Sequence, residues 1–219
     1  MTLNGDDAVA VISTSSGKVV KTIPTGRAPH ITLRSPSGDR IYVTSEGDMK
    51  VVAIDTAEWK VAAEIPVLAW PRVLAVSNDG KQLYQTIRWL NGALVLDTAK
   101  NQVVDRIALG EPKFAAEGKD AHGLAVTPDG KELWLTTQTD DLVTVLSVGD
   151  HKVLAQVKGG RDPNWLGFTP DGKTAVVGNT GSGDVSLIDV KSRKVTGTVK
   201  VGKSPKRLAV GSVVTQSAR

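Results

Sequence analysis

Thr-Pro-Asp-Gly-Lys, at residues 127–131 and again at 169–173, is the stretch of sequence that decides the fold. Two looser copies precede it, Ser-Pro-Ser-Gly-Asp at 35–39 and Ser-Asn-Asp-Gly-Lys at 77–81. The glycines of successive copies are 42, 50 and 42 residues apart. Asp-Gly and Pro-Asp-Gly sequences favour tight reversals of the chain. The chain is therefore expected to repeat one unit that is punctuated by the same turn.

Other positions recur in the same phase and complete the repeat. Five valines are each followed four residues later by Ile or Val: Val19, Val61, Val103, Val153 and Val195. A proline column contains Pro29, Pro71, Pro163 and Pro205, with Ala121 in the third repeat. A period of about 40–45 residues with short apolar runs is typical of a β-propeller built from four-stranded blades. The sequence thus predicts an all-β propeller of five repeats.

The whole chain, residues 1–219, is expected to form a single propeller domain. The predicted repeats are approximately 1–28, 29–70, 71–120, 121–162 and 163–204, and 205–219 is expected to be a closing strand. Pairing of the two ends would complete a fifth blade and protect the sheet edges, so a closed five-blade ring is favoured. The alternative is that the chain is a fragment of a larger ring.

The composition excludes several classes of function. The chain has no cysteine, which excludes disulfides, thiolate nucleophiles and metal sites with cysteine ligands. No apolar stretch has the length of a transmembrane helix, so no membrane span is expected. The net charge is +4 and is spread along the chain. This balance suits an anionic partner, but without a basic run it does not indicate nucleic acid.

The repeat resembles the YVTN β-propeller repeats. The resemblance rests on sequences such as Ala-Val-Thr-Pro-Asp-Gly-Lys at 125–131 and Val-Ser-Leu-Ile-Asp at 185–189, and residues 42–45 read Tyr-Val-Thr-Ser. It covers essentially the whole chain and implies the propeller fold. It also implies a periplasmic or extracellular location, because the family includes surface-layer and secreted proteins. The first residues do not have the charged segment followed by an apolar segment that is typical of a signal peptide. A cytoplasmic location is therefore the alternative.

Candidate binding residues occupy the position directly after the proline column. All five are polar, and they are His30, Arg72, His122, Asn164 and Lys206. In a propeller this position opens into the central channel, so these side chains are expected to form a ring at its mouth. Arg and Lys attract carboxylate or phosphate groups, and His can bind a transition metal. No metal or other cofactor is expected, because the two histidines lie beside cations. If a metal were bound, His30 and His122 would be its ligands.

The 50-residue interval contains an insertion, at residues 111–120, immediately before His122. Its residues are expected to lie on the face of the ring, where departures from a repeat often carry binding loops. The candidate contacts there are Lys113, Phe114, Glu117, Lys119 and Asp120. Arg88 and Trp89, in a loop between strands of another repeat, are further candidates for contact with a partner. A tolerated surface insertion is the alternative.

These patterns favour a non-catalytic scaffold or binding protein that uses the face carrying the insertion and the ring. The expected partner is another protein or an anionic small molecule. No catalytic fingerprint occurs with its required context. The alternative function is an enzyme of the lactonase, lyase or metal- or cofactor-dependent redox type. The YVTN resemblance implies this alternative, because the family includes relatives that resemble lactonases and redox propellers. His30 and His122 would then act at the channel mouth.

Overall fold

The computed structural model describes residues 1–110 and 120–211, which form five antiparallel sheets, here called blades 1 to 5. Blade 1 contains β1 (Thr2–Leu3), β2 (Ala8–Ile12) and β3 (Val19–Pro24). Blade 2 contains β4 (Pro29–Arg34), β5 (Arg40–Ser45), β6 (Lys50–Asp55) and β7 (Lys60–Pro66). Blade 3 contains β8 (Pro71–Val76), β9 (Gln82–Ile87), β10 (Gly92–Asp97) and β11 (Gln102–Ala108). Blade 4 contains β12 (Ala121–Val126), β13 (Glu132–Thr137), β14 (Leu142–Ser147) and β15 (Val153–Lys158), and blade 5 contains β16 (Pro163–Phe168), β17 (Thr174–Asn179), β18 (Asp184–Asp189) and β19 (Lys194–Lys200).

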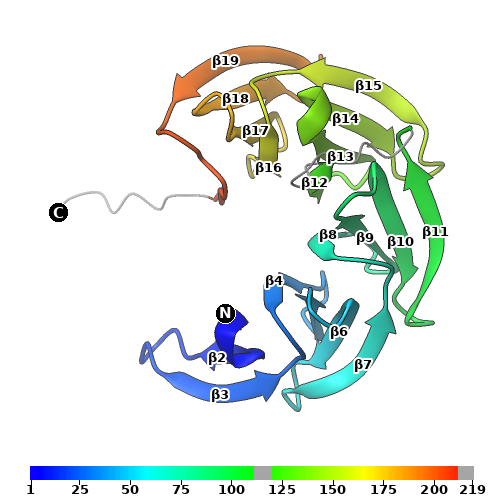
Figure 1. Cartoon of the computed structure of the whole chain (residues 1–219), viewed down its shortest axis with the longest axis vertical. Coiled ribbons are helices and arrows are strands. Elements are labelled where there is room, and N and C mark those ends of the chain that lie inside the picture. Colours follow the sequence, from blue (N-terminus) through cyan, green and yellow to red (C-terminus); the bar gives the residue numbers. More distant parts are fainter. Residues whose placement is uncertain (111–119, 212–219) are drawn as a thin grey trace.

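The blades are arranged around a central axis, each with its first strand inside and its last strand outside (Figure 1). The predicted all-β propeller is therefore confirmed, and its strands fall where the repeat places them. The only helical segments in the described part are two short 3₁₀ turns, at Asn4–Asp6 and Gln138–Asp140. None of the described helical segments is long and apolar enough to cross a membrane.

Apolar side chains pack between neighbouring blades and form the core. Between blades 3 and 4, for example, Tyr84, Leu133 and Leu146 are completely buried. Each buried leucine of this kind contributes about 1.5–3 kcal/mol relative to an exposed one. The inner strands approach closely at Gly123, where an added Cβ would lie 2.4 Å from the carbonyl oxygen of Asn164. This close packing fixes the position of each strand start around the channel.

The repeated Asp-Gly sequence forms the turn between the first two strands of a blade. The Thr127 hydroxyl donates to the Asp129 carboxylate at 2.6 Å, and the same carboxylate accepts the Lys131 amide at 3.1 Å. Gly130 has a φ of 75°, in the left-handed region that glycine adopts at little cost. The equivalent bonds occur in the turns of blades 3 and 5. These aspartates therefore serve the architecture.

Among the residues that the structure describes, blade 1 has three strands in the order β1-β2-β3, with no inner strand beside β1. Residues 201–211 form no strand, and 212–219 lie outside the described residues. The described end of the chain runs inward past blade 5 (Figure 1), where Leu208 and Val210 pack over Gly167 of β16. Pairing of 205–219 with blade 1, and hence closure of the ring, stays a prediction.

Candidate functional site

The starts of the inner strands bring most of the predicted ring together. His30, Arg72 and His122 occupy the second position of β4, β8 and β12, and Asn164 has the same place in β16. The prolines that precede three of them are buried, so each strand enters the channel from a fixed point. Lys206, on the segment that follows blade 5, is close enough that its charge affects the His122 imidazole. The structure thus places His30, Arg72, His122 and Asn164 at the same end of four inner strands.

Glu46, which directly follows β5, joins the side chains of blades 2 and 3. Its carboxylate accepts hydrogen bonds from Arg72 Nη1 at 3.1 Å and from Trp70 Nε1 at 3.2 Å. His30 Nδ1 lies 3.7 Å from the same carboxylate. The Glu46 and Arg72 side chains are mostly shielded from solvent, so their attraction is screened less than that of a surface pair.

Arg207 enters the cluster from the C-terminal segment and contacts blade 2. Its Nη2 lies 3.0 Å from His30 Nε2, and its guanidinium carbon is 5.8 Å from the centroid of the Trp165 ring. Because arginine only donates hydrogen bonds, His30 Nε2 must be the acceptor and its proton must reside on Nδ1. Burial and the charges of Arg207 and Arg72 lower the pKa of His30, against an opposing effect of Glu46. His30 is therefore a neutral acceptor here.

His122 and Asn164 are almost completely buried, with exposed fractions of 7% and 3%. The His122 Nδ1 and the Asn164 side-chain oxygen have no hydrogen-bond partner among the described residues. Burial is the main cause that lowers the pKa of His122 to about 3, and the nearby charges of Arg72 and Lys206 act in the same direction. A buried polar atom without a partner costs free energy, which a bound ligand can recover.

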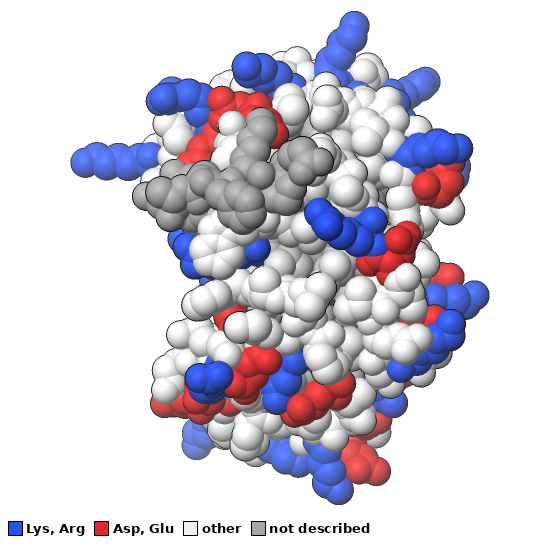
Figure 2. All heavy atoms as spheres, turned by 45° about the vertical axis from the view of Figure 1, so that its right-hand side comes forward, with Lys and Arg blue, Asp and Glu red and all other residues white. Residues whose placement is uncertain are grey.

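The charge at the mouth is positive on balance. Arg72, Lys206 and Arg207 contribute three cations, and both imidazoles are neutral. Glu46 is the carboxylate in direct contact with the cluster, and even with buried Asp120 counted as charged the cations remain in excess. On the outer surface, by contrast, Lys and Arg lie next to Asp and Glu, and no broad area of one charge is visible on the face in Figure 2.

Among the described residues, no group of three or more His, Asp or Glu side chains has the arrangement needed to hold a metal ion. The side chain in contact with His30 Nε2 is a guanidinium, which repels a cation. The donors that converge here therefore suit an anion with hydrogen-bond acceptors better than a metal.

Arg88 and Trp89 lie at the rim of the same face, in the loop between β9 and β10. The Arg88 guanidinium carbon stands 5.7 Å from the Trp70 ring centroid and 4.6 Å from the Trp89 centroid. Trp70 in turn bonds Glu46, so this loop is continuous with the channel cluster. Of the insertion, Asp120 is buried, and Lys113, Phe114, Glu117 and Lys119 lie outside the described residues.

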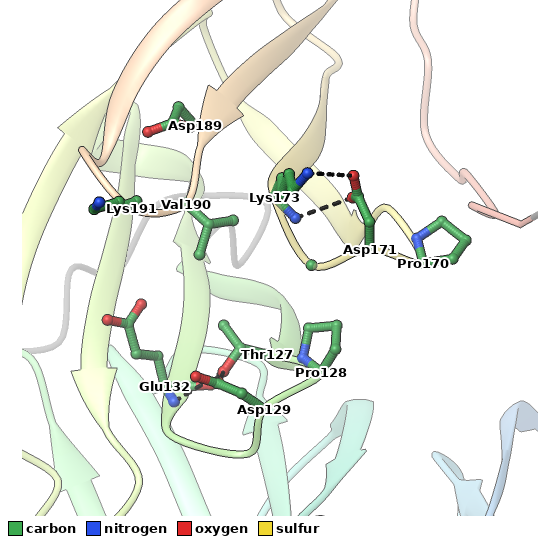
Figure 3. A pocket seen from close by; sticks show the side chains of 11 residues that line it. Thr127, Pro128, Asp129, Glu132, Pro170, Asp171, Lys173, Asp189, Val190 and Lys191 are labelled. Atoms are coloured by element: carbon green, nitrogen blue, oxygen red, sulfur yellow. Dashed lines mark hydrogen bonds and ion pairs between the residues drawn. The ribbon is translucent and has the colours of Figure 1, made fainter.

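A hollow opens between blades 4 and 5, at the end of the molecule opposite the channel mouth (Figure 3). Its volume is about 790 Å³, and its lining includes Asp129, Glu132 and Asp171. These carboxylates already accept bonds, Asp129 from Thr127, Asp171 from Thr169, and Glu132 from Trp134 and Arg193. The equivalent groove between blades 2 and 3 has a volume of about 510 Å³. Such grooves recur with the blades and do not mark a special site.

Sequence reasoning did not find Glu46 or Arg207 as members of the cluster. Glu46 belongs to a loop position that is occupied by Arg88, Gln138 and Thr180 in other repeats, so no shared residue type marks it. Arg207 lies one place beyond the ring position, where other repeats have residues such as Ile31 and Trp165. The pair Lys206-Arg207 was the available signal, because it places two adjacent cations where the other repeats begin their inner strand.

Comparisons with known proteins support the fold. Residues 1–118 match the family model described as YNCE-like beta-propeller. No curated protein matches the chain.

Solved structures with the same fold are larger than this chain. A functionally unknown protein from Desulfotomaculum acetoxidans superposes with a TM-score of 0.79 at 17% identity, covering 93% of this chain and 66% of its own. Kuenenia stuttgartiensis hydrazine synthase gives a TM-score of 0.70 at 24% identity, over 80% of this chain and 49% of its own. Dihydro-heme d1 dehydrogenase NirN, in complex with DHE, gives a TM-score of 0.70 at 20% identity and covers 90% of this chain and 42% of its own. At these identities the likeness shows the fold alone.

Proposed function

Since the chain belongs to the YNCE-like β-propeller family, a fold that serves many functions, we propose from its site that it is a non-catalytic binding protein. It holds an anionic group, a carboxylate or a phosphate, at the channel mouth. The observation that carries this proposal is the convergence of Arg72, Lys206 and Arg207 around two neutral imidazoles. The cations attract the ligand, and the buried, unpartnered Nδ1 of His122 can donate a hydrogen bond to it when that nitrogen carries the ring proton.

The state of the histidines supports binding over acid–base catalysis. An efficient general acid or base has a pKa near the working pH. With a pKa of about 3, His122 stays neutral and is a weak base at neutral pH. His30 already uses Nε2 to accept from Arg207. Both rings are therefore suited to orient a ligand, and neither is poised to exchange protons with it.

Calorimetric titration of phosphate and of citrate into the purified chain tests the proposal. We expect saturable binding to wild type that weakens as ionic strength rises. The double variant Lys206→Glu/Arg207→Glu should weaken it by about tenfold or more, because charge-assisted hydrogen bonds are worth about 1.5–3 kcal/mol each.

The matched control is Lys191→Glu/Lys194→Glu, which reverses two exposed charges of blade 5, one in the turn after β18 and one at the start of β19. It should leave the affinity unchanged. Equal effects of the two double variants, or no binding of either anion to wild type, would show that the channel mouth is not an anion site.

A further inference from the structure

Two neighbouring loops of blade 3 have large apolar residues at places where blades 2 and 5 have small or polar ones. One loop joins β7 to β8 and the other joins β9 to β10, and their apolar residues are Leu68, Trp70, Trp89 and Leu90. The aligned residues of blades 2 and 5 are, in the same order, Gly26 and Gly160, Ala28 and Asp162, Gly47 and Gly181, and Asp48 and Ser182. A departure confined to one blade of a repeat indicates a local function.

Blades 2 and 5 connect these two loops with polar bonds. The Asp48 carboxylate accepts the Arg27 amide at 2.9 Å, and the Ser182 hydroxyl oxygen accepts the Arg161 amide at 3.0 Å. Leu90 occupies the aligned place in blade 3 and cannot accept a bond. The loops instead meet through aromatic rings, with Trp70 and Trp89 edge to face at 6.3 Å and Arg88 over both.

Stacking alone does not explain the apolar surface around these rings. Leu68 is 77% exposed and Trp70 is 37% exposed. Trp89 has a φ of 64°, in the left-handed region that Met49, Trp59 and other turn residues of this chain also adopt. Exposed apolar residues gathered at one place stabilise the fold little and are typical of an interaction surface.

A hollow of about 220 Å³ lies between the two loops, and Leu68, Trp89, Leu90 and Leu94 contribute to its walls. Its two charged lining residues, Arg88 and Arg106, are both cationic. Arg106 is exposed on β11. A pocket for a whole small molecule usually measures about 300–1,000 Å³. The smaller hollow here matches a single large side chain, and exposed Arg106 at its border matches an acidic neighbour of that side chain.

We propose that these residues, the blade 3 platform (Leu68, Trp70, Arg88, Trp89 and Arg106), dock an acidic segment of another protein. One large apolar side chain of the partner fills the hollow, and an adjacent Asp or Glu pairs with Arg106. Exposed tryptophan and arginine around a small pocket are the residues that most often dominate the energy of a protein interface. The hollow of the platform shares no lining residue with the ring, although Trp70 at the edge of the platform bonds Glu46.

Selection from a random peptide library against the purified chain tests this inference. We expect the enriched peptides to share one large apolar residue flanked by Asp or Glu. Their affinity should fall about tenfold or more in Trp89→Gly, which restores the residue of blades 2 and 5 and fits the local φ. Leu68→Ser and Arg106→Glu, both at exposed positions, should also weaken binding without changing the thermal unfolding midpoint.

The control variant is Arg161→Glu, which removes an exposed cation from the same face of blade 5. It should leave peptide binding unchanged. The inference is overturned if no peptide is enriched, if enriched peptides lack the acidic and apolar pattern, or if Leu68→Ser and Arg106→Glu bind them as wild type does. Phosphate titration of Leu68→Ser distinguishes the two sites, because this variant should keep the full anion affinity.

Discussion

At the residue scale, Gln85 shows how one side chain can conflict with the repeat. Its position on β9 is occupied by Val43, Leu135 and Val177 in blades 2, 4 and 5. The Gln85 side chain is completely buried, and neither of its amide atoms has a hydrogen-bond partner among the described residues. Burial of such a group without a partner costs about 1–3 kcal/mol.

We therefore predict that Gln85→Leu raises the free energy of unfolding by about 1–3 kcal/mol. Denaturant titration at neutral pH measures this change. Gln102→Leu, an exposed position on β11, is the control and should alter stability by less than about 0.5 kcal/mol. A loss of stability in Gln85→Leu would mean that the amide has a structural partner.

His122 makes a second prediction at this scale. Its pKa in the folded chain is about 3, below the ordinary value of 6.5, so the unfolded chain binds more protons between these values. Stability should therefore fall as the pH drops from about 6.5 toward 4.5, before the carboxylates protonate. His122→Asn should reduce this slope. Denaturant titrations across this range measure it, and an unchanged slope in the variant would contradict the assigned state of His122.

At the scale of the element, threonines on the second strands position the ring. Thr86 Oγ1 donates to the carbonyl oxygen of His122 at 2.6 Å, and Thr136 Oγ1 donates to that of Asn164 at 3.1 Å. Blades 3 and 4 each thus fix the strand start of the next blade. The same position in blade 5 is Gly178, where an added Cβ would lie 3.3 Å from the carbonyl oxygen of Pro205.

We predict that Thr136→Val destabilises the chain by about 1–3 kcal/mol, because it leaves buried backbone groups of β12 and β16 without this partner. It should also weaken phosphate binding, since Asn164 loses its support. Thr196→Val on the outer strand β19, where the hydroxyl is exposed, should change neither property. Normal phosphate affinity in Thr136→Val would show that the bridges do not position the site.

The strands were the most predictable elements, because the sequence contains several copies of each strand at the same position in the repeat. Residues 57–65 favour helix by propensity, yet their register with other repeats predicts the strand that the structure shows as β7. The ring position was predictable for the same reason. Glu46 and Arg207 were not, because their roles depend on contacts between blades that no single repeat encodes. The stack of Arg88 on Trp70 likewise requires two loops that are distant in sequence.

At the scale of the whole molecule, the C-terminal segment connects blade 5 to the channel. Leu208 and Val210 pack over Gly167, and from there Arg207 reaches His30 of blade 2. The segment therefore delivers two of the three cations of the site. Its position depends on the absence of a side chain at Gly167, where an added Cβ would lie 3.3 Å from Val210.

We predict that Gly167→Val displaces this segment and lowers phosphate affinity without changing any charged residue. Calorimetry measures the affinity, and circular dichroism checks that the blades remain folded. Gly5→Val is the control, because no atom lies within 4 Å of its added Cβ. Unaltered phosphate affinity in Gly167→Val would show that the segment does not carry the site.

The three histidines allow the anion site to be tested in a single measurement. His30 and His122 lie at the channel mouth, whereas His151 lies in an outer turn beside Tyr84 and Asp105. Phosphate is titrated into histidine-labelled chain at constant pH and ionic strength while the imidazole resonances are followed by NMR. The proposed function predicts saturable shifts of the His30 and His122 resonances with one common dissociation constant, and none for His151. Equal shifts of all three histidines, or none, would contradict an anion site at the channel mouth.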